Sequence, residues 1–257
     1  MSTPTLSDIL NVATEAAYIA GRRTLAYFNT GIAVETKADK SPVTQADREA
    51  EAIIRSIIQK YFPTHSLLGE EAGAQPGDPN YRWIIDPIDG TKSFICGVPL
   101  YGVLIGVEVR GQPHVGAVYL PALDEMLTAA TGLGCKWNNR TARVSTTAKL
   151  SDAIVSTTSF TALANRGAFE TISSRTKIMR GWGDAYGHVL AATGRIDAMI
   201  DPHMNPWDAA PFAPIYKEAG GCYTNWRGDA TIHGKDGLGS NAALHAEILT
   251  LLSFATQ

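Results

Sequence analysis

The segment at residues 83–94, WIIDPIDGTKSF, constrains this chain more than any other stretch. Its apolar run ends at Asp86, and the Pro87 that follows cannot donate the backbone hydrogen bond that would continue a sheet. Gly90 then allows the backbone to approach a ligand closely. Backbone N–H groups after such a glycine can open a helix whose positive end faces an anion. The segment therefore predicts a strand, a turn and a helix start that can bind phosphate.

Two carboxylates, Asp86 and Asp89, stand three residues apart in this turn. Carboxylates this close repel each other unless a cation neutralises them or one is protonated. A hard divalent cation is the simplest partner, and magnesium is the usual ion beside phosphate. The Asp-x-x-Asp spacing by itself also fits a turn with a capping aspartate, but the whole segment is far more specific.

Two other stretches carry acidic residues at suggestive positions. Glu70 and Glu71 follow an apolar run, and Asp208 follows Pro206-Trp207 at the start of an expected helix. Each has an ordinary alternative: Asp208 by itself fits a helix N-cap, and Glu71 by itself fits a solvated surface charge.

The hydrophobic pattern changes near the middle of the chain. Residues 1–150 read as an α+β half and residues 151–257 as an α/β half, with no flexible linker between them. We expect one compact unit in which the first half carries most of the metal ligands. The second half would complete the metal and substrate site at the shared interface, where small-molecule sites often lie.

Apolar spacing predicts two helices in the first half, over Leu6–Phe28 and from an N-cap at Thr44 to about Tyr61, with a polar loop at Thr36–Pro42 between them. Asp47 stands three residues after Thr44, as in a capping box. Strands are expected at Arg82–Asp86, Val103–Val109, Val115–Tyr119 and Glu125–Ala130, with a hairpin turn at Asn138-Asn139.

The second half predicts strands and helices in alternation. The strands are expected at Ala153–Thr157 and Ile196–Asp201, and the helices near 161–174, at Asp184–Ala192 and at Trp207–Ala219. Proline inside a helix removes a hydrogen bond and bends the axis. We therefore expect Pro214 to kink the last helix.

Composition excludes several classes of protein. A net charge of -3 gives no basic excess for nucleic acid, and no run of about 18 apolar residues predicts a membrane span. The N-terminus lacks the features of a signal peptide, and three scattered cysteines form no CxxC pair, which favours a cytoplasmic protein with reduced thiols. No GxSxG, HExxH or Walker motif is present. The histidines share no metal-ligand spacing and are interpreted as surface or hydrogen-bonding residues: His65, His114, His188, His203, His233 and His245.

Over nearly its whole length the chain resembles the inositol monophosphatase superfamily. The resemblance rests on VTQAD (43–47), LLGEE (67–71), WIIDPIDGT (83–91), and NPWDAA with EAGG (205–210 and 218–221). It implies a layered αβαβα sandwich and a homodimer that hydrolyses a small phosphate monoester. It also implies two or three Mg²⁺ ions, with Mn²⁺ as a substitute and Li⁺ as an inhibitor.

The resemblance also assigns roles to residues of this chain. Metal ligands would be Glu70, Asp86, the Ile88 carbonyl, Asp89 and Asp208, with Asp86 bridging two ions. Asp47 and Thr91, assisted by Glu70, would form the catalytic group that activates the attacking water. The implied substrate contacts are Asp89, Gly90, Thr91, Gly183, Asp184, Ala185, Asp201 and Asp208.

Two segments favour a particular branch of this superfamily. Thr91-Lys92-Ser93-Phe94 and Gly183-Asp184-Ala185-Tyr186-Gly187 resemble the histidinol-phosphatase branch, which acts in histidine biosynthesis. Histidinol phosphate carries an ammonium group, which an acidic side chain can pair with. Asp184 fits a helix cap equally well at this stage. Two alternatives stay open: an inositol 1-phosphate or broad sugar-phosphate or nucleotide monophosphatase, and a catalytically silent interaction protein on this fold.

Overall fold

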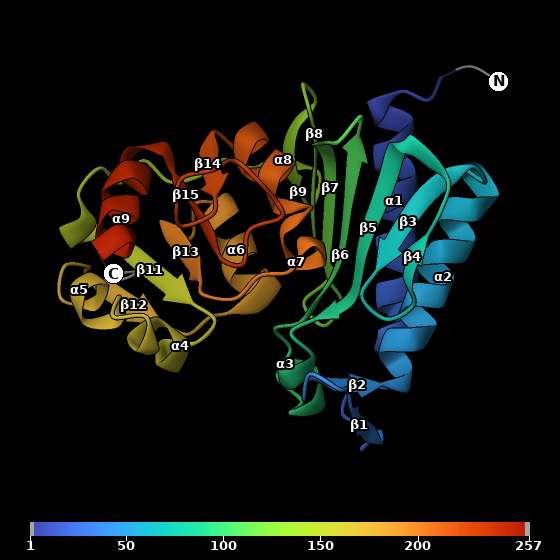
Figure 1. The fold of residues 1–257 in the computed structure, drawn as a ribbon, viewed down its shortest axis with the longest axis horizontal. Helices are drawn as coiled ribbons and strands as arrows, with labels where there is room; N and C mark the ends of the chain where they lie inside the picture. The colour runs from blue at the N-terminus through green and yellow to red at the C-terminus, as the bar shows by residue number, and fades with distance from the viewer. Residues whose placement is uncertain (1–2, 255–257) are drawn as a thin grey trace.

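Two N-terminal helices cover one face of the larger sheet in the computed structural model, which describes residues 3–254 (Figure 1). They are α1 (Leu6–Thr24) and α2 (Gln45–Tyr61). Each begins with a threonine N-cap and a capping box, Thr5 with Asp8 and Thr44 with Asp47, so the predicted cap of α2 is confirmed. The first helix ends at Thr24 rather than at Phe28, because the chain turns back toward the hairpin that follows.

That hairpin contains the polar loop predicted at Thr36–Pro42: residues 37–41 connect its two strands, and only the end residues Thr36 and Pro42 are paired. Strands β1 (Val34–Thr36) and β2 (Pro42–Thr44) pair antiparallel, with Val34 opposite Thr44. Each strand has only three residues, exposed throughout in β1 and buried at Val43 and Thr44 in β2, which is too short for an alternating pattern to be recognised. The hairpin lies next to the short helix α3 (Thr91–Ile95) (Figure 1).

The larger sheet has eight strands in the order β10-β9-β8-β7-β6-β5-β3-β4. Their bounds are β3 (His65–Gly69), β4 (Gly73–Gln75), β5 (Asp78–Asp89), β6 (Gly102–Val109), β7 (Gln112–Leu120), β8 (Glu125–Ala130), β9 (Gly134–Trp137) and β10 (Arg140–Thr141). Neighbours run antiparallel except β3 and β5, which are parallel. The predicted strands lie within β5 to β8, and the predicted turn at Asn138-Asn139 joins β9 to β10 with positive φ at both residues.

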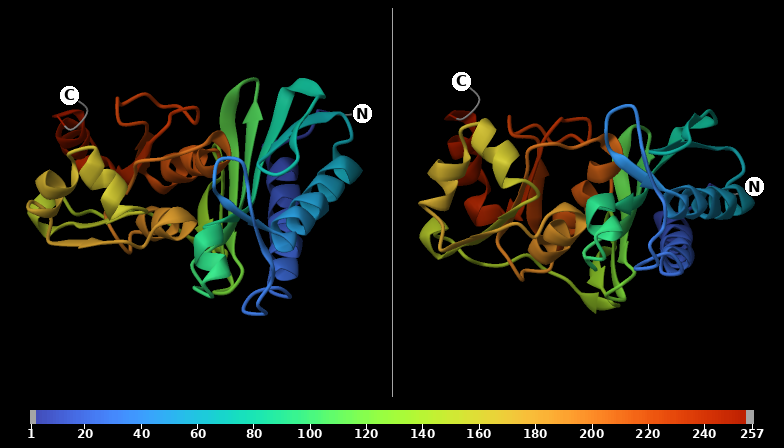
Figure 2. Two further views of the ribbon diagram at one scale, coloured as in Figure 1. Left: turned by 60° about the horizontal axis from the view of Figure 1, so that its bottom comes forward. Right: turned by 90° about the horizontal axis from the view of Figure 1, so that it is seen from below.

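The smaller sheet has five strands in the order β12-β11-β13-β15-β14. Its elements are the 3₁₀ turn η1 (Leu150–Asp152), β11 (Ile154–Thr157), α4 (Phe160–Asn165), α5 (Phe169–Ser173), β12 (Ile178–Arg180), α6 (Asp184–Ala192), β13 (Ala198–Asp201), α7 (Pro206–Ala209), α8 (Phe212–Ala219), β14 (Gly221–Thr224), β15 (Gly237–Asn241) and α9 (Ala242–Phe254). Helices α6 and α8 lie between the two sheets, and α4, α5 and α9 lie on the outer face (Figures 1 and 2).

Two predicted helices are each divided in two. The helix predicted at 161–174 breaks at Gly167, whose φ of 72° lies in the left-handed region, so α4 ends before α5 begins. The helix predicted at Trp207–Ala219 breaks at Pro211, which is the N-cap of α8. Pro214 then lies in the first turn of α8, where no backbone donor is needed, so the kink predicted there was wrong.

Three apolar cores separate the layers. One joins α1 and α2 to the larger sheet through residues such as Ile54 and Trp83. A second fills the space between the sheets around Leu104 and Phe212, and a third packs α9 on the smaller sheet at Val155. This is the five-layered αβαβα arrangement that was predicted. Within residues 3–254, no helix has both the length and the apolar character needed to cross a membrane.

Candidate active site

Local hydrogen bonds shape the turn at the end of β5. The Ile88 N–H donates to Asp86 Oδ1 at 3.0 Å, and the Thr91 hydroxyl donates to the Ile88 carbonyl at 3.1 Å. The β5–β6 register shifts between Asp86, which is opposite Leu104, and Asp89, which is opposite Gly102, so the strand is irregular where it carries the two carboxylates. Gly90 has φ of 81° and precedes α3. The strand and the helix start predicted for this segment are therefore confirmed, but the strand does not end at Asp86: β5 continues past Pro87 to Asp89, and the turn is at Gly90.

The carboxylates of Asp86, Asp89 and Asp208 form a cluster whose oxygen atoms lie within 4.8 Å of one another. Asp208 is not the N-cap of α7: Asn205 is, and it donates its backbone N–H to Asp208 Oδ2 at 2.7 Å, which makes Asp208 the third-position member of a capping box. Three carboxylates and no nitrogen or sulfur donors fit a hard divalent cation.

The pKa shifts of the three aspartates also indicate a cation site. Burial, and then the charge of Glu70, raises the pKa of Asp86 well above its usual range. Burial also raises the pKa of Asp89 well above its usual range and that of Asp208 to about 7. Without a cation, these groups cannot all be ionised together at neutral pH.

Glu70 follows β3 and donates its backbone N–H to the Ile85 carbonyl at 3.1 Å. Its side chain accepts a hydrogen bond from Lys37 Nζ at 2.8 Å, and Lys37 also contacts Glu71 at 2.5 Å. Glu71 is mostly buried, so its interpretation as a solvated charge was wrong. Sequence reasoning missed Lys37, because a single lysine in a polar loop carries no recognisable pattern.

Asp47 and Thr91 are not hydrogen-bonded to each other among residues 3–254. Asp47 Oδ2 accepts from the Thr44 N–H at 2.8 Å and from the Thr44 hydroxyl at 2.6 Å, while Thr91 donates to Ile88. Burial raises the pKa of Asp47, and the nearby Glu70 adds to that effect. The shared role implied for these two residues stays a prediction.

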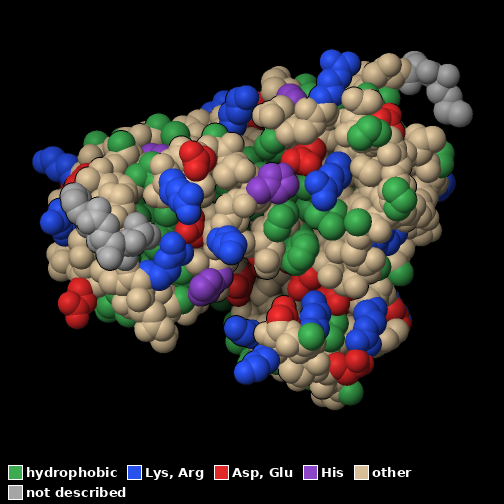
Figure 3. Space-filling view, viewed as in Figure 1, with side chains coloured by type: hydrophobic (Ala, Val, Ile, Leu, Met, Phe, Trp, Pro, Cys, Tyr) green, Lys and Arg blue, Asp and Glu red, His purple; other side chains and the backbone are tan. Residues whose placement is uncertain are grey.

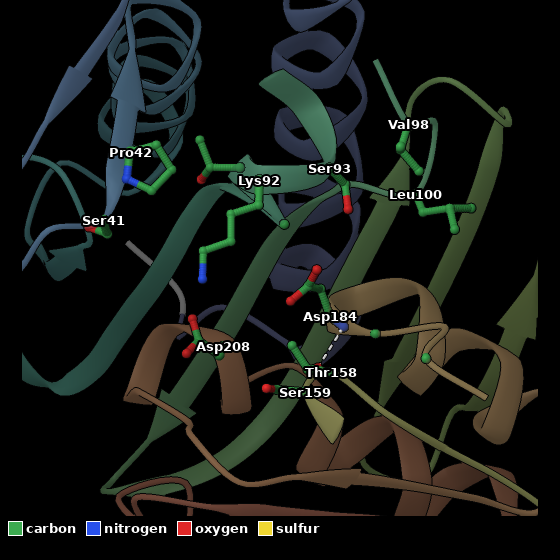
Figure 4. A pocket seen from close by; sticks show the side chains of 14 residues that line it. Ser41, Pro42, Lys92, Ser93, Val98, Leu100, Thr158, Ser159, Asp184 and Asp208 are labelled. Atoms are coloured by element: carbon green, nitrogen blue, oxygen red, sulfur yellow. Dashed lines mark hydrogen bonds between the residues drawn. The ribbon is translucent and has the colours of Figure 1, made fainter. Parts of the chain in front are cut away.

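The start of α6 supplies the other side of the site. The Ala185 N–H donates to Asp89 Oδ2, which links the two halves of the chain. The Asp184 N–H donates to the Thr158 hydroxyl at 2.9 Å (Figure 4). Gly183 is the N-cap of α6, and the Asp184 side chain makes no capping hydrogen bond. The helix-cap interpretation of Asp184 was therefore wrong, and its carboxylate is available to the site.

The Asp184 carboxyl group lies against the turn at Gly90. A Cβ atom added to Gly90 would stand 3.2 Å from Asp184 Oδ2. Burial, and then the charge of Asp201, raises the pKa of Asp184 to about 7, while Lys92 acts in the opposite direction. Figure 4 shows Lys92, Asp184 and Asp208 pointing toward the same space.

Two cavities meet at these residues. The larger holds about 510 Å³ and is lined from both halves of the chain, by residues that include Ser41, Gly90, Thr91, Lys92, Thr158, Gly183, Asp184 and Asp208. The smaller, of about 50 Å³, is lined by residues that include Asp89, Ala185, His188 and Asp201. The space-filling view is hollowed between the halves, with acidic side chains in the hollow (Figure 3).

His188 is a member of this site that sequence reasoning assigned no function. Its Nε2 atom lies 3.2 Å from Asp201 Oδ2, and both side chains are buried. The available signal was its spacing, because His188 stands four residues after Asp184 and therefore on the same side of α6.

A five-layered αβαβα fold with an acidic cluster beside a glycine turn defines a class of phosphatases that act on small phosphate esters. The family model for the inositol monophosphatase family matches residues 5–257, and the chain belongs to that family. The chain is 43% identical to a histidinol-phosphatase of Chlorobaculum parvum over 89% of this chain and 90% of that protein. It is 37% identical to a histidinol-phosphatase of Mycobacterium tuberculosis, over 86% and 88%. Among solved structures, the inositol monophosphatase of Thermotoga maritima superposes with a TM-score of 0.89 at 31% identity, covering 96% of this chain and 98% of that one.

Proposed function

We propose that this phosphatase is Mg²⁺-dependent and hydrolyses histidinol phosphate, a step of histidine biosynthesis. The observation that carries the proposal is the Asp184 carboxyl group beside Gly90, because it puts an acidic group next to the proposed phosphate site. The histidinol-phosphatases of Chlorobaculum parvum and Mycobacterium tuberculosis, which are among the relatives, support this substrate.

Glu70, Asp86, the Ile88 carbonyl, Asp89 and Asp208 would hold the metal ions, and the oxygen-only cluster of three aspartates fits them. Bound Mg²⁺ would lower the pKa of the attacking water and neutralise charge on the phosphate. Two or three ions, replacement by Mn²⁺ and inhibition by Li⁺ belong to the same proposal.

Side chains and backbone groups would do the remaining work. Gly90 and Thr91 would hold the phosphate. Gly90 has a left-handed backbone and no side chain that would block the approach of the phosphate. Asp47, Thr91 and Glu70 would orient the attacking water and accept its proton. Gly183 and Ala185 would shape the wall facing the substrate, where the Ala185 N–H fixes the Asp89 carboxylate.

The organic part of the substrate would lie between Asp184 and Asp201. An ammonium group can pair with one or both carboxylates, and a hydrogen bond to a charged group contributes about 1.5–3 kcal/mol. That corresponds to roughly tenfold to a hundredfold in selectivity. Inositol 1-phosphate has no ammonium group and would leave these carboxylates without their partner.

The test compares kcat/KM for histidinol phosphate and inositol 1-phosphate on wild type and Asp184→Asn. We expect wild type to prefer histidinol phosphate and Asp184→Asn to lose about tenfold or more of that preference. Asp152→Asn, an exposed residue away from the site, is the control and should behave as wild type. Preference of the wild type for inositol 1-phosphate would refute the proposed substrate. An unchanged ratio in Asp184→Asn would refute the role of that residue.

The solved Thermotoga maritima inositol monophosphatase favours inositol 1-phosphate as the second candidate substrate. A panel with sugar phosphates and nucleoside monophosphates would measure the breadth of activity. Absence of phosphate release with every substrate in Mg²⁺ would favour the silent interaction protein. A homodimer and a cytoplasmic location are also part of the proposal, and sedimentation of the purified protein tests the first of them.

A further inference from the structure

The imidazole of His188 is held from three sides on the inner face of α6. Its Nε2 atom is 3.2 Å from Asp201 Oδ2, and its Nδ1 atom is 3.2 Å from the Tyr216 hydroxyl. The ring also stacks on Phe212, with 4.3 Å between the ring centroids. His188 is 1% exposed, so the ring cannot turn without losing these contacts.

These contacts determine which group His188 presents to Asp201. An ionised carboxylate only accepts hydrogen bonds, so Nε2 carries the hydrogen and donates it. The Tyr216 hydroxyl lies 3.2 Å from Nδ1 and also donates toward the His188 backbone carbonyl at 3.4 Å, so it contacts His188 at both the ring and the backbone. Tyr216 therefore holds the ring in the orientation that directs Nε2 at Asp201.

Asp201 is held at only one of its two oxygen atoms. Among residues 3–254, its side chain has no hydrogen-bond partner other than His188, which bonds Oδ2. Asp201 and His188 line the same small cavity as Asp89 and Asp184. The second oxygen, Oδ1, is thus left for a ligand, while the first is fixed by His188.

We propose that His188, supported by Tyr216, is a positioning residue that fixes the Asp201 carboxylate for the cationic part of the substrate. The inference rests on the proposed function, since it assigns the selectivity of that site to a residue behind Asp201. A carboxylate fixed in advance loses less conformational freedom on binding than one that rotates freely. His188 would therefore act on substrate binding rather than on the chemical step.

The experiment measures kcat and KM for histidinol phosphate and for glycerol 2-phosphate, which has no ammonium group. His188→Leu removes the donor, and we expect the ratio of the two kcat/KM values to fall about tenfold, mainly through a higher KM for histidinol phosphate. His188→Gln keeps an N–H donor and should restore most of the ratio. Equal losses on both substrates in His188→Leu and no rescue by His188→Gln would mean a structural role and overturn the proposal.

A double variant separates positioning through Asp201 from any direct effect. If His188 acts through Asp201, then His188→Leu/Asp201→Asn should be no worse than Asp201→Asn alone, whereas additive losses would overturn the inference. Failure of the proposed function is recognised separately, as a wild type that prefers inositol 1-phosphate. The same set of variants assayed on that substrate then still measures the coupling between His188 and Asp201.

Discussion

Gly90 and Asp184 come together from the two halves of the chain, with Asp184 Oδ2 3.2 Å from the place where a Cβ of residue 90 would stand. This contact brings together the turn that we propose binds phosphate and the residue that we propose determines substrate selectivity. Gly90 has a φ of 81°, which favours glycine, and its lack of a side chain leaves room for the Asp184 carboxyl group.

We expect Gly90→Ala to lose about 1–2 kcal/mol of unfolding free energy from the left-handed backbone and at least tenfold in kcat/KM from displacement of Asp184. Gly111→Ala is a matched control, since Gly111 has a φ of 75° and no atom within 4 Å of an added Cβ. It should lose similar stability and keep its activity. Equal activity losses in the two variants would show that the contact with Asp184 has no role.

Asp47 offers a second matched comparison, because α1 and α2 begin with the same capping box. Asp47→Asn should lower stability by about 1 kcal/mol as a cap and lower kcat far more if it orients the attacking water. In α1, Asp8 accepts from the Thr5 N–H and hydroxyl just as Asp47 does from Thr44. Asp8→Asn should therefore lower the melting temperature without changing kcat. A normal kcat in Asp47→Asn would leave that residue a cap only.

Local sequence patterns predicted the structural features that are determined by residues close together in the chain. The segment from Asp86 to Thr91 and the capping box of Thr44 and Asp47 follow from backbone chemistry that neighbouring residues determine. The layered fold followed from the resemblance, which covers nearly the whole chain. The division into halves at residue 150 stays a prediction, as do the roles of the site residues.

Contacts between distant segments could not be predicted in the same way. Lys37 reaches Glu70 across 33 positions, and the Tyr216 hydroxyl reaches His188 across 28. No local pattern marks the lysine, and the spacing of His188 from Asp184 places it on one side of α6 without indicating its contact with Tyr216. The break at Pro211 was also missed, because a helical apolar pattern can continue across two short helices.

The raised pKa of Asp184 predicts how stability depends on pH. Its pKa is about 7 in the folded protein, against about 4 for an unperturbed aspartate. Between these values the folded state binds more protons than the unfolded state, so the free energy of unfolding falls as pH rises from about 4 to about 7. The melting temperature of metal-free wild type should fall over this range, and that of Asp184→Asn should fall less. A fall of the same size in Asp184→Asn, with Asp152→Asn matching wild type, would contradict the raised pKa.

Removal of metal tests the acidic cluster directly. Asp86, Asp89 and Asp208 are buried together, so Mg²⁺ should bind the folded state far better than the unfolded state. At a hundred times its dissociation constant, such an ion adds about 2.7 kcal/mol to the free energy of unfolding. We expect Mg²⁺ to raise the melting temperature of wild type and of Asp152→Asn but not of Asp89→Asn.

Activity should follow the same pattern. Asp89→Asn should fold, since it removes one of several mutually repelling charges, but lose most of its phosphatase activity. EDTA should abolish the activity of wild type, and added Mg²⁺ should restore it. Full activity in Asp89→Asn, or in wild type freed of metal by EDTA, would refute the metal mechanism. If Asp89→Asn lost the thermal shift in Mg²⁺ but kept its activity, the bound ion would contribute to stability and not to catalysis.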